Sequence, residues 1–236
     1  MSQQRARPDD DAEAAWLAPV PVDPEAAVEE QRLADLLRRV LHRLVLVRPS
    51  PAALRKVAAA TAAFADELDT LPARGGSGDI GEAGLRPQDH VRHSPLSGTS
   101  NPLAPPMQMW TTGTSPTGHP ITAGSVRFGA AYEGPPEHVH GGYVAALFDE
   151  LLGRTQGSAG FTAWLTVNYH RPTPLDRTLT LHAEVERVEG RKRWIRGTCH
   201  LGDTLLSEAE GLFIAPREGA SLEALRESLK RNSTPL

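Results

Sequence analysis

Residues 133–150 read EGPPEHVHGGYVAALFDE and form the most informative segment of the sequence. A proline-rich loop runs through the paired glycines Gly141 and Gly142 directly into an apolar helix. Glycine lets a ligand approach the backbone closely. The first amides of a helix lack intrahelical partners, and the helix dipole places its positive end there. The stretch therefore predicts a helix start that can stabilise an oxyanion on a carbonyl or thioester oxygen, although a merely tight helix start is an equally ordinary explanation.

The predicted helix carries two adjacent carboxylates, Asp149 and Glu150, among apolar neighbours. Adjacent helical residues project about 100° apart, so the two side chains cannot share one role. Asp149 follows Gly142 by about two helical turns and lies on the same side as the helix start. A carboxylate in apolar surroundings needs a partner, so Asp149 is the candidate general base or nucleophile. Glu150 is expected on a solvated or interface face, and two plain surface charges remain the alternative.

Short strand patterns surround this helix on both sides. Two precede it, at residues 107–113 and 121–129, and four alternating segments follow, at residues 161–172, 179–188, 193–201 and 204–216. In the second and third of these four, alternation predicts one-faced rows: Leu179, Leu181, Ala183 and Val185, and then Ile195, Gly197, Cys199 and Leu201. Glu189-Gly190 and Gly202-Asp203 predict tight turns, which join antiparallel neighbours. Two strands, a helix and an antiparallel meander predict an α+β domain in which a curved antiparallel sheet wraps around one central helix.

Four ordered segments resemble the PaaI-like hotdog-fold acyl-CoA thioesterases, most closely the thioesterase superfamily member 4-like branch. The segments are HGGYVAALFDE, TAWLTVNYHRPTPL, VEGRKRW and LLSEAEGLFI, and the resemblance covers roughly residues 98–216. It implies that the glycine amides after His140, with Gly142 as the oxyanion hole, polarise a thioester carbonyl. It also implies that Asp149 is the catalytic carboxylate and that Thr162, reaching across a subunit boundary, supports the attacking water.

Two details qualify this resemblance. Simple strand alternation puts Thr162 on the face opposite the row that includes Leu165, Val167 and Tyr169. Several PaaI relatives carry an asparagine six residues before the HGG histidine, where this chain has Gly134. The member 4-like branch also lacks that asparagine and has a similar Gly-Pro-Pro loop.

Five further residues are candidates for substrate binding. His140 and Gly141 are expected to shape the substrate loop, with His140 orienting it through hydrogen bonds. His138, which is extra to the family pattern, either touches the substrate or faces solvent. Arg191 and Lys192 belong to a basic turn that either meets the phosphates of CoA or is simply solvated.

The bulk composition excludes several classes of protein. The chain has 236 residues, a formal net charge of −4 and one cysteine, Cys199. These properties argue against non-specific nucleic-acid binding, a disulfide framework and a cysteine-based zinc site, and no metal or cofactor is expected. The apolar stretches are too short to span a bilayer, and the N-terminus lacks the apolar region of a signal peptide. We expect a cytoplasmic protein.

The chain divides into five expected parts. They are a disordered N-terminus (1–20), a helical hairpin (21–71), a Pro/Gly/Ser-rich linker without regular elements (72–106), the hotdog domain (107–216) and a C-terminal tail (217–236) that forms a short helix around Leu222. The first hairpin helix begins at Pro24 and ends before Pro49, and the second begins near Ser50-Pro51. The hairpin is too small to own a core, so we expect it to dock on the hotdog domain or on a partner subunit.

The sequence thus predicts hydrolysis of a fatty or aromatic acyl-CoA by a homodimer or homotetramer that shares its active sites between subunits. Two alternatives remain. One is a non-catalytic acyl-CoA-binding or regulatory hotdog protein. The other is a hotdog hydratase or dehydratase, which is disfavoured because no histidine follows Asp149 before His170.

Overall fold

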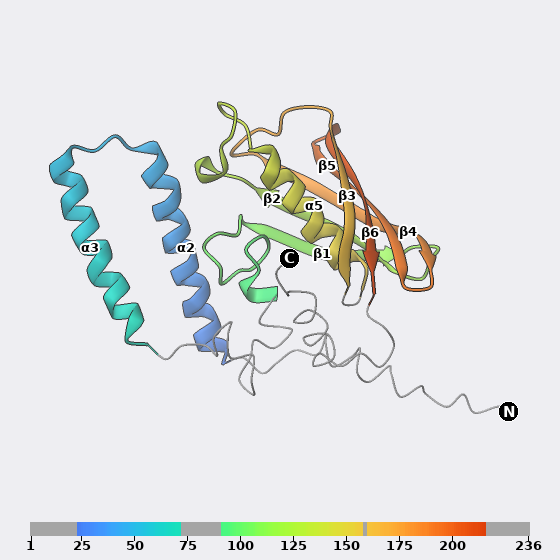
Figure 1. Cartoon of the computed structure of the whole chain (residues 1–236), viewed down its shortest axis with the longest axis horizontal. Coiled ribbons are helices and arrows are strands. Elements are labelled where there is room, and N and C mark those ends of the chain that lie inside the picture. Colours follow the sequence, from blue (N-terminus) through green and yellow to red (C-terminus); the bar gives the residue numbers. More distant parts are fainter. Residues whose placement is uncertain (1–22, 72–90, 158–159, 216–236) are drawn as a thin grey trace, which may run out of the picture.

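The computed structural model describes residues 23–71, 91–157 and 160–215 (Figure 1). The predictions made for residues 1–20, for most of the linker and for the C-terminal tail therefore lie outside the described residues. Among those that are described, no helix combines the length and the hydropathy that a membrane span requires.

Six antiparallel strands form one sheet in the order β1-β2-β4-β5-β6-β3. They are β1 (Met107–Thr114), β2 (Pro120–Arg127), β3 (Phe161–Tyr169), β4 (Thr178–Glu189), β5 (Lys192–Leu201) and β6 (Thr204–Ile214). The predicted turns are confirmed, since Gly190 and Gly202 both have φ of 56° and join β4 to β5 and β5 to β6. This positive φ is where glycine carries no steric penalty.

Strand β3 departs from the predicted meander. It pairs with β6 rather than with β4, its neighbour in sequence, so only β4, β5 and β6 form a meander. No tight turn follows β3: residues 170–177 contain Pro172 and Pro174 and carry the chain to the far side of the meander. Strand β3 therefore forms one edge of the sheet, and β1 forms the other.

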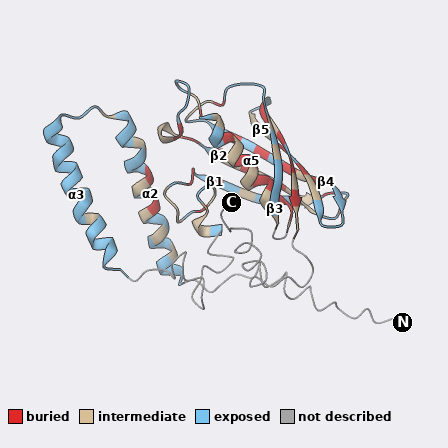
Figure 2. Ribbon diagram, in the orientation of Figure 1, coloured by how far each residue is buried: buried red, intermediate tan, exposed pale blue. Residues whose placement is uncertain are grey.

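Helix α5 (Gly141–Thr155) lies in the curve of the sheet and contacts β2 to β6 (Figure 1). The side chains between helix and sheet form the hydrophobic core, coloured red in Figure 2. The predicted inward row of β4 is confirmed, because all four of its members are buried: Leu179, Leu181, Ala183 and Val185. The expected α+β architecture, a curved antiparallel sheet around one central helix, is confirmed.

Helix α2 (Pro24–Leu46) docks on the domain through one narrow face. Arg38 is buried and donates to the carbonyl oxygens of Ala104 at 2.7 Å and Asn101 at 3.1 Å. His42 Nδ1 accepts the backbone N–H of Ala131, at 3.0 Å, in the short helix η1 (Ala130–Tyr132). Residues 91–106, the last part of the predicted linker, therefore lie against α2 and the domain. Residues 91–93 are helical, so the prediction that this segment holds no regular element is wrong there.

Helix α3 (Pro51–Asp69) contributes no buried residue. Its start is as predicted, because Ser50 caps it by accepting the amide of Ala53 at 3.3 Å. The hairpin as a whole is thus docked through α2, while α3 stands beside α2 away from the sheet (Figure 1).

Candidate active site

The start of α5 is fixed by two side chains. His140 is the N-cap, and its Nδ1 accepts the amide of Gly142 at 3.0 Å. The Tyr169 hydroxyl, at the end of β3, donates to the carbonyl oxygen of Gly141 at 2.9 Å. The orienting role expected of His140 is consistent with this cap, although the cap also occupies the amide that the sequence assigned to the oxyanion hole. The amide of Gly141 donates to no residue that the structure describes.

The loop before α5 is packed too tightly for a side chain at Gly134. A Cβ built there would lie 2.7 Å from the Cα of His140, closer than real Cβ atoms come. The Gly134 amide also donates to the carbonyl oxygen of His138 at 2.9 Å. The absence of the asparagine seen in several PaaI relatives thus has a steric reason in this chain. His138 is half-buried, and its Nδ1 lies 2.8 Å from the carbonyl oxygen of Pro136, so its ring belongs to the loop's own hydrogen bonding.

Beneath the helix start lies Tyr132, which is buried. Its ring contacts Tyr143 edge-on at a centroid distance of 5.0 Å and Phe128 at 5.4 Å. Its carbonyl oxygen accepts the His140 amide at 2.9 Å. Burial raises the pKa of the Tyr132 hydroxyl to about 12, so this support stays uncharged at neutral pH.

Within the described chain, the Asp149 carboxylate has one side-chain hydrogen-bond partner, which is Thr162. The Thr162 hydroxyl on β3 donates to Asp149 Oδ1 at 2.7 Å. Asp149 is half-buried and Thr162 is exposed, so the pair lies at the edge of the core beside β3. The sequence named both residues. The contact is made within one chain, whereas the resemblance implied that Thr162 would reach across a subunit boundary.

A β-bulge explains why Thr162 faces the helix. The pairing of β3 with β6 shifts register between Thr162 and Trp164, so Ala163 is an extra residue. An extra residue reverses the alternation of the residues before it. Thr162 is consequently opposite Phe213, a core residue, and shares the inward face of Leu165. The prediction that Thr162 lies on the face opposite that row is therefore wrong, because it counted the strand as regular.

Glu150 points to a different environment from Asp149. Its Oε1 accepts the Ser97 hydroxyl, from the segment before β1. The two adjacent carboxylates thus have separate partners on separate sides of α5, as their angular separation predicts. Glu150 is half-buried rather than fully solvated.

The basic turn lies at the end of the sheet where β3 begins. Lys192 pairs in register with Ile214, which pairs with Phe161. Arg191 donates from its guanidinium to the carbonyl oxygen of Ala215 at 2.9 Å, and Lys192 is exposed. The turn is therefore at the Thr162 end of β3, and the helix start with Tyr169 is at the other end.

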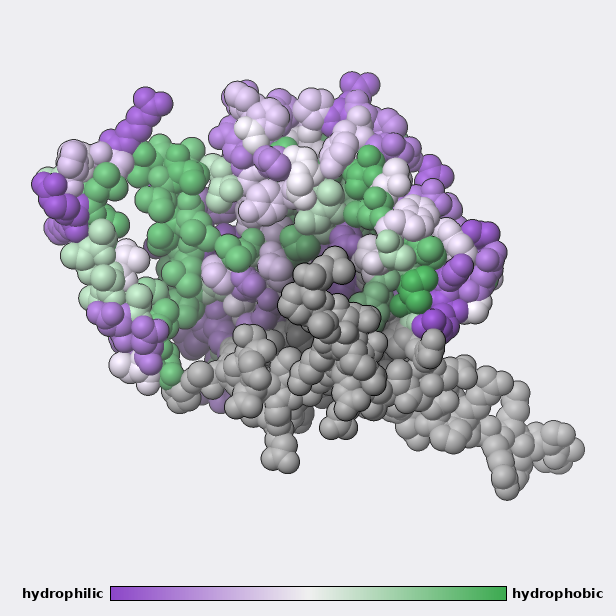
Figure 3. Space-filling model, viewed as in Figure 1, coloured by the Kyte–Doolittle hydropathy of each residue, from purple (hydrophilic) through white to green (hydrophobic). Residues whose placement is uncertain are grey.

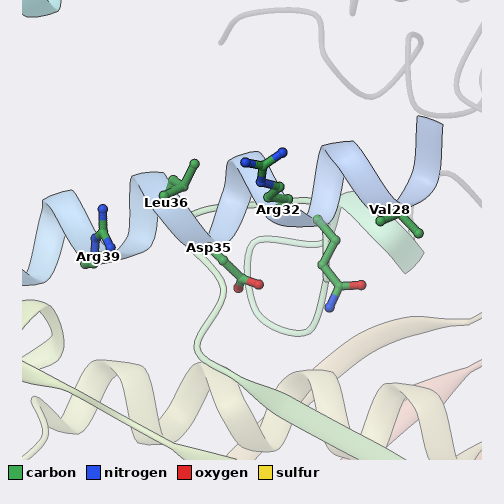
Figure 4. Close-up of a pocket in the computed structure, with 6 residues that line it drawn as sticks. Val28, Arg32, Asp35, Leu36 and Arg39 are labelled. Atoms are coloured by element: carbon green, nitrogen blue, oxygen red, sulfur yellow. The ribbon is translucent and has the colours of Figure 1, made fainter. Parts of the chain in front are cut away.

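Two surface hollows lie elsewhere. One, of about 520 Å³, runs along α2 alone (Figure 4) and is lined by Val28, Gln31, Arg32, Asp35, Leu36 and Arg39. Another, of about 440 Å³, lies between the segment before β1, β1 itself and Arg154. Neither is lined by Asp149 or Thr162, which lie half-buried and exposed, respectively, beside β3. The described residues hold no group of three or more His, Cys, Asp or Glu side chains able to bind a metal ion.

Sequence reasoning missed two residues of the site. Tyr169 was placed on the correct strand face by alternation, but its contact with Gly141 depends on where β3 ends relative to α5. Gly134 was noted as a departure from the family pattern, without the close packing that requires it.

Comparison with known proteins agrees with this architecture. The family model described as the thioesterase superfamily matches residues 137–208. The solved structure of RHA08564, a thioesterase superfamily protein, is 34% identical with a TM-score of 0.64, and the match covers 79% of this chain and 90% of that one.

Two curated relatives match a shorter region. Acyl-coenzyme A thioesterase THEM4 of Bos taurus is 39% identical over 88 residues, which is 36% of this chain and 37% of that protein. Acyl-coenzyme A thioesterase THEM5 of Homo sapiens is 31% identical over 91 residues, with coverage of 36% and 37%. The matched region thus spans well under half the length of these two relatives.

The sheet order, the enclosed helix and the loop that starts it define a hotdog-fold protein. Because the 34% identity to RHA08564 extends over 90% of that protein, the chain belongs to the thioesterase superfamily.

Proposed function

We propose that this chain hydrolyses acyl-CoA thioesters, with Asp149 as general base or nucleophile. The observation that carries the proposal is the half-buried Asp149 carboxylate, which accepts a hydrogen bond from the Thr162 hydroxyl at 2.7 Å. Asp149 lies on α5, the helix whose first residues supply the two glycine amides. The relatives named as acyl-coenzyme A thioesterases support the choice of substrate class.

In the general-base route, Asp149 takes a proton from water while the water oxygen attacks the thioester carbonyl carbon. The carbon–sulfur bond then breaks, and the CoA sulfur leaves and takes up a proton, which gives the free acid and CoA. In the nucleophilic route, an Asp149 oxygen attacks the thioester carbonyl carbon, the carbon–sulfur bond breaks and the CoA thiolate leaves and takes up a proton. Water then hydrolyses the resulting anhydride, which gives the free acid and restores the Asp149 carboxylate. Thr162 supports both routes, since its hydroxyl can orient either the carboxylate or the water.

Two amides compete for the role of oxyanion donor. The amide of Gly142 is the expected donor, but it already donates to His140 Nδ1 at 3.0 Å. The amide of Gly141 has no such partner in the described chain and sits in the same turn. We therefore propose Gly141 as the first donor, with Gly142 joining it when the His140 ring turns away.

The acyl and CoA parts of the substrate are proposed to lie on either side of Asp149. A fatty or aromatic acyl group would follow the apolar flank of α5. The basic turn at Arg191 and Lys192 is proposed to meet the CoA phosphates, because both side chains lie at the exposed Thr162 end of β3. His138 contributes loop shape rather than a substrate contact, given its bond to Pro136.

We further propose that a second copy of the chain pairs along β3. Among the described strands β3 is an edge of the sheet, and its aromatic side chains Phe161, Trp164 and Tyr169 are 39–52% exposed. An exposed apolar edge strand is a ready site for pairing. Such pairing would cover the open Asp149–Thr162 edge and exclude water from it.

The test is a thiol-release assay with a panel of acyl-CoAs of different chain length and aromaticity. We expect one thiol per acid formed by the native chain, and loss of release in Asp149→Ala. Tight acyl-CoA binding without thiol release would instead indicate a non-catalytic acyl-CoA-binding protein, and full release by Asp149→Ala would contradict the assignment.

A further inference from the structure

Helix α2 packs against the loop that leads into the candidate active site. It contacts the short helix η1, which lies between β2 and α5 (Figure 1). His42 is central to this contact, because its Nδ1 accepts the Ala131 amide at 3.0 Å and its ring meets the Tyr132 ring edge-on at 5.4 Å. Gly129 leaves room for the imidazole, since a Cβ there would lie 2.7 Å from the His42 Cε1. The His42 ring is thus fitted closely into the turn before α5.

Three hydrogen bonds in series connect His42 to the start of α5, beginning with the bond from the Ala131 amide. The next residue is Tyr132, whose carbonyl oxygen accepts the His140 amide at 2.9 Å. His140 Nδ1 in turn accepts the Gly142 amide at 3.0 Å. The His42 ring therefore holds η1, η1 holds His140, and His140 holds the turn that carries both glycine amides.

Arg38 supports the same loop from a second side. Its guanidinium donates to the carbonyl oxygens of Asn101 at 3.1 Å and Ala104 at 2.7 Å. Between these two residues, the carbonyl oxygen of Leu103 accepts the Tyr132 hydroxyl at 3.0 Å. Helix α2 thus holds both the backbone and the hydroxyl end of Tyr132, through two residues that lie about one helical turn apart.

The docking of α2 depends on these polar contacts more than on apolar burial. Only Ala34 and Arg38 of this helix are buried. Its larger apolar side chains give the hydrophobic surface along α2 that Figure 3 shows, and four of them are 36–55% exposed: Leu36, Val40, Leu41 and Leu44. A contact with so little buried apolar surface opens at a lower free energy than the core does. The sheet and α5 therefore stay folded when α2 separates from the loop.

We propose that α2 supports the active-site loop and that His42 is a positioning residue, so that thioester hydrolysis is fast while α2 is docked and slow when it is not. This role rests on the proposed acyl-CoA hydrolysis. His42 touches neither the substrate nor the reacting atoms, and it acts through Tyr132 and His140. The glycine amides stabilise the oxyanion chiefly in the transition state, so losing His42 lowers kcat more than it raises KM.

Three variants of the full chain separate positioning from packing. His42→Leu keeps an apolar side chain in the turn but accepts no hydrogen bond. His42→Asn restores an acceptor, because the asparagine Oδ1, like the histidine Nδ1, is bonded to Cγ. Arg43→Leu changes the next residue of α2, which is exposed, and is the matched control. Circular dichroism verifies that all three are folded.

Steady-state thiol release from acyl-CoA measures the effect on catalysis. In His42→Leu, kcat should fall about 10-fold while KM stays within about twofold of the native value. His42→Asn should recover most of the lost kcat, and Arg43→Leu should match the native chain. A native kcat in His42→Leu, or the same loss in His42→Asn as in His42→Leu, would overturn the role of His42.

Amide hydrogen exchange on the same proteins tests the series of hydrogen bonds without any substrate. His42→Leu should speed exchange at Ala131, His140 and Gly142 about 2- to 10-fold, while the amides of β4 in the core keep their native rates. Faster exchange throughout the sheet, or at Ala131 alone, would overturn the proposal, because α2 would then add only stability. If the native chain released no thiol, the proposed function would fail, and exchange at His140 and Gly142 would still decide whether α2 holds the loop.

Discussion

Helices α5 and α3 are both rich in apolar residues, but only α5 finds its partners within the described chain. The α5 residues Phe148, Leu151 and Leu152 are all 0% exposed, because the sheet curves around them. Helix α3 has no buried residue at all. The apolar side chains of α5 therefore form part of the hydrophobic core, whereas those of α3 remain exposed on the surface. Asp149 and the two glycine amides of the candidate site belong to α5, the helix that the sheet encloses.

Helix α2 stands between these two cases. Its docked face carries Ala34 and Arg38, and the leucine-rich stripe next to that face stays exposed. The boundary between the packed, site-bearing domain and the exposed part of the hairpin thus runs along α2.

The largest expected effect comes from a matched pair of phenylalanines. Phe148→Ala empties a fully buried position and should lower the free energy of unfolding by about 3–5 kcal/mol. Phe64→Ala on α3 should cost less than about 1 kcal/mol in dilute protein, because Phe64 is only partly buried. Urea denaturation measures both. Equal costs for Phe64→Ala and Phe148→Ala would show that α3 is packed as tightly as α5 and would contradict the contrast between the two helices.

A smaller effect is expected at the bulge of β3. Thr162→Ala removes a hydrogen bond to a carboxylate, worth about 1.5–3 kcal/mol, so kcat/KM should fall roughly 10- to 100-fold. Thr162→Ser should keep most of the activity. Thr166→Ala, on the outward face of the same strand, should leave kcat/KM within about twofold of the native value. Similar losses in Thr162→Ala and Thr166→Ala would mean that the hydroxyl has no special role.

The next effect concerns the loop that positions His140. Gly134→Ala adds a Cβ 2.7 Å from the His140 Cα, and such overpacking costs about 1–3 kcal/mol of stability. The rate of thiol release should also fall, because the added Cβ displaces His140 and with it the start of α5. Gly113→Ala is the control, since a Cβ there meets nothing nearer than Ile121 Cδ1 at 4.0 Å. Unchanged stability and activity in Gly134→Ala would show that the loop adapts.

The smallest effect is the pH dependence of α2 docking. Burial, together with the Arg38 charge, lowers the pKa of His42 below its usual value, although Asp176 opposes this. The neutral ring accepts the Ala131 amide, so the docked state binds fewer protons than the undocked state around pH 6.5. Docking should be complete above that pH and weaken as pH falls through the lowered pKa. Hydrogen exchange of the Ala131 amide measures this, and His42→Gln should remove the pH dependence. Faster exchange at higher pH beyond the intrinsic rate would contradict the sign.

Local patterns predicted most of the fold. Alternation identified the inward row of β4 and β5, and the glycine turns identified their pairing, because these properties depend on neighbouring residues only. The position of β3 beside β6 was not predictable in this way, since a crossover depends on the whole sheet. The docked face of α2 was also missed, because a buried arginine in place of leucines depends on carbonyl groups 63 and 66 residues away.

The candidate site was predictable to a similar extent. Helical geometry alone separated Asp149 from Glu150, and their different partners agree with it. The predicted strand face of Thr162 was wrong, because the extra residue Ala163 reverses the alternation. The sequence pattern gives no sign of this bulge. The occupied amide of Gly142 was missed because the His140 ring could cap it only in the folded loop.

The most direct test of the proposed chemistry compares two neighbouring carboxylates on α5. Asp149→Asn and Glu150→Gln each remove one charge with almost no change in side-chain volume. Asp149 accepts a hydrogen bond from Thr162, whereas Glu150 accepts one from Ser97. Steady-state thiol release from acyl-CoA, measured on both variants in parallel, should fall about 10²- to 10⁴-fold for Asp149→Asn and stay near the native rate for Glu150→Gln. Native-like release by Asp149→Asn, or an equal loss in both variants, would contradict the account.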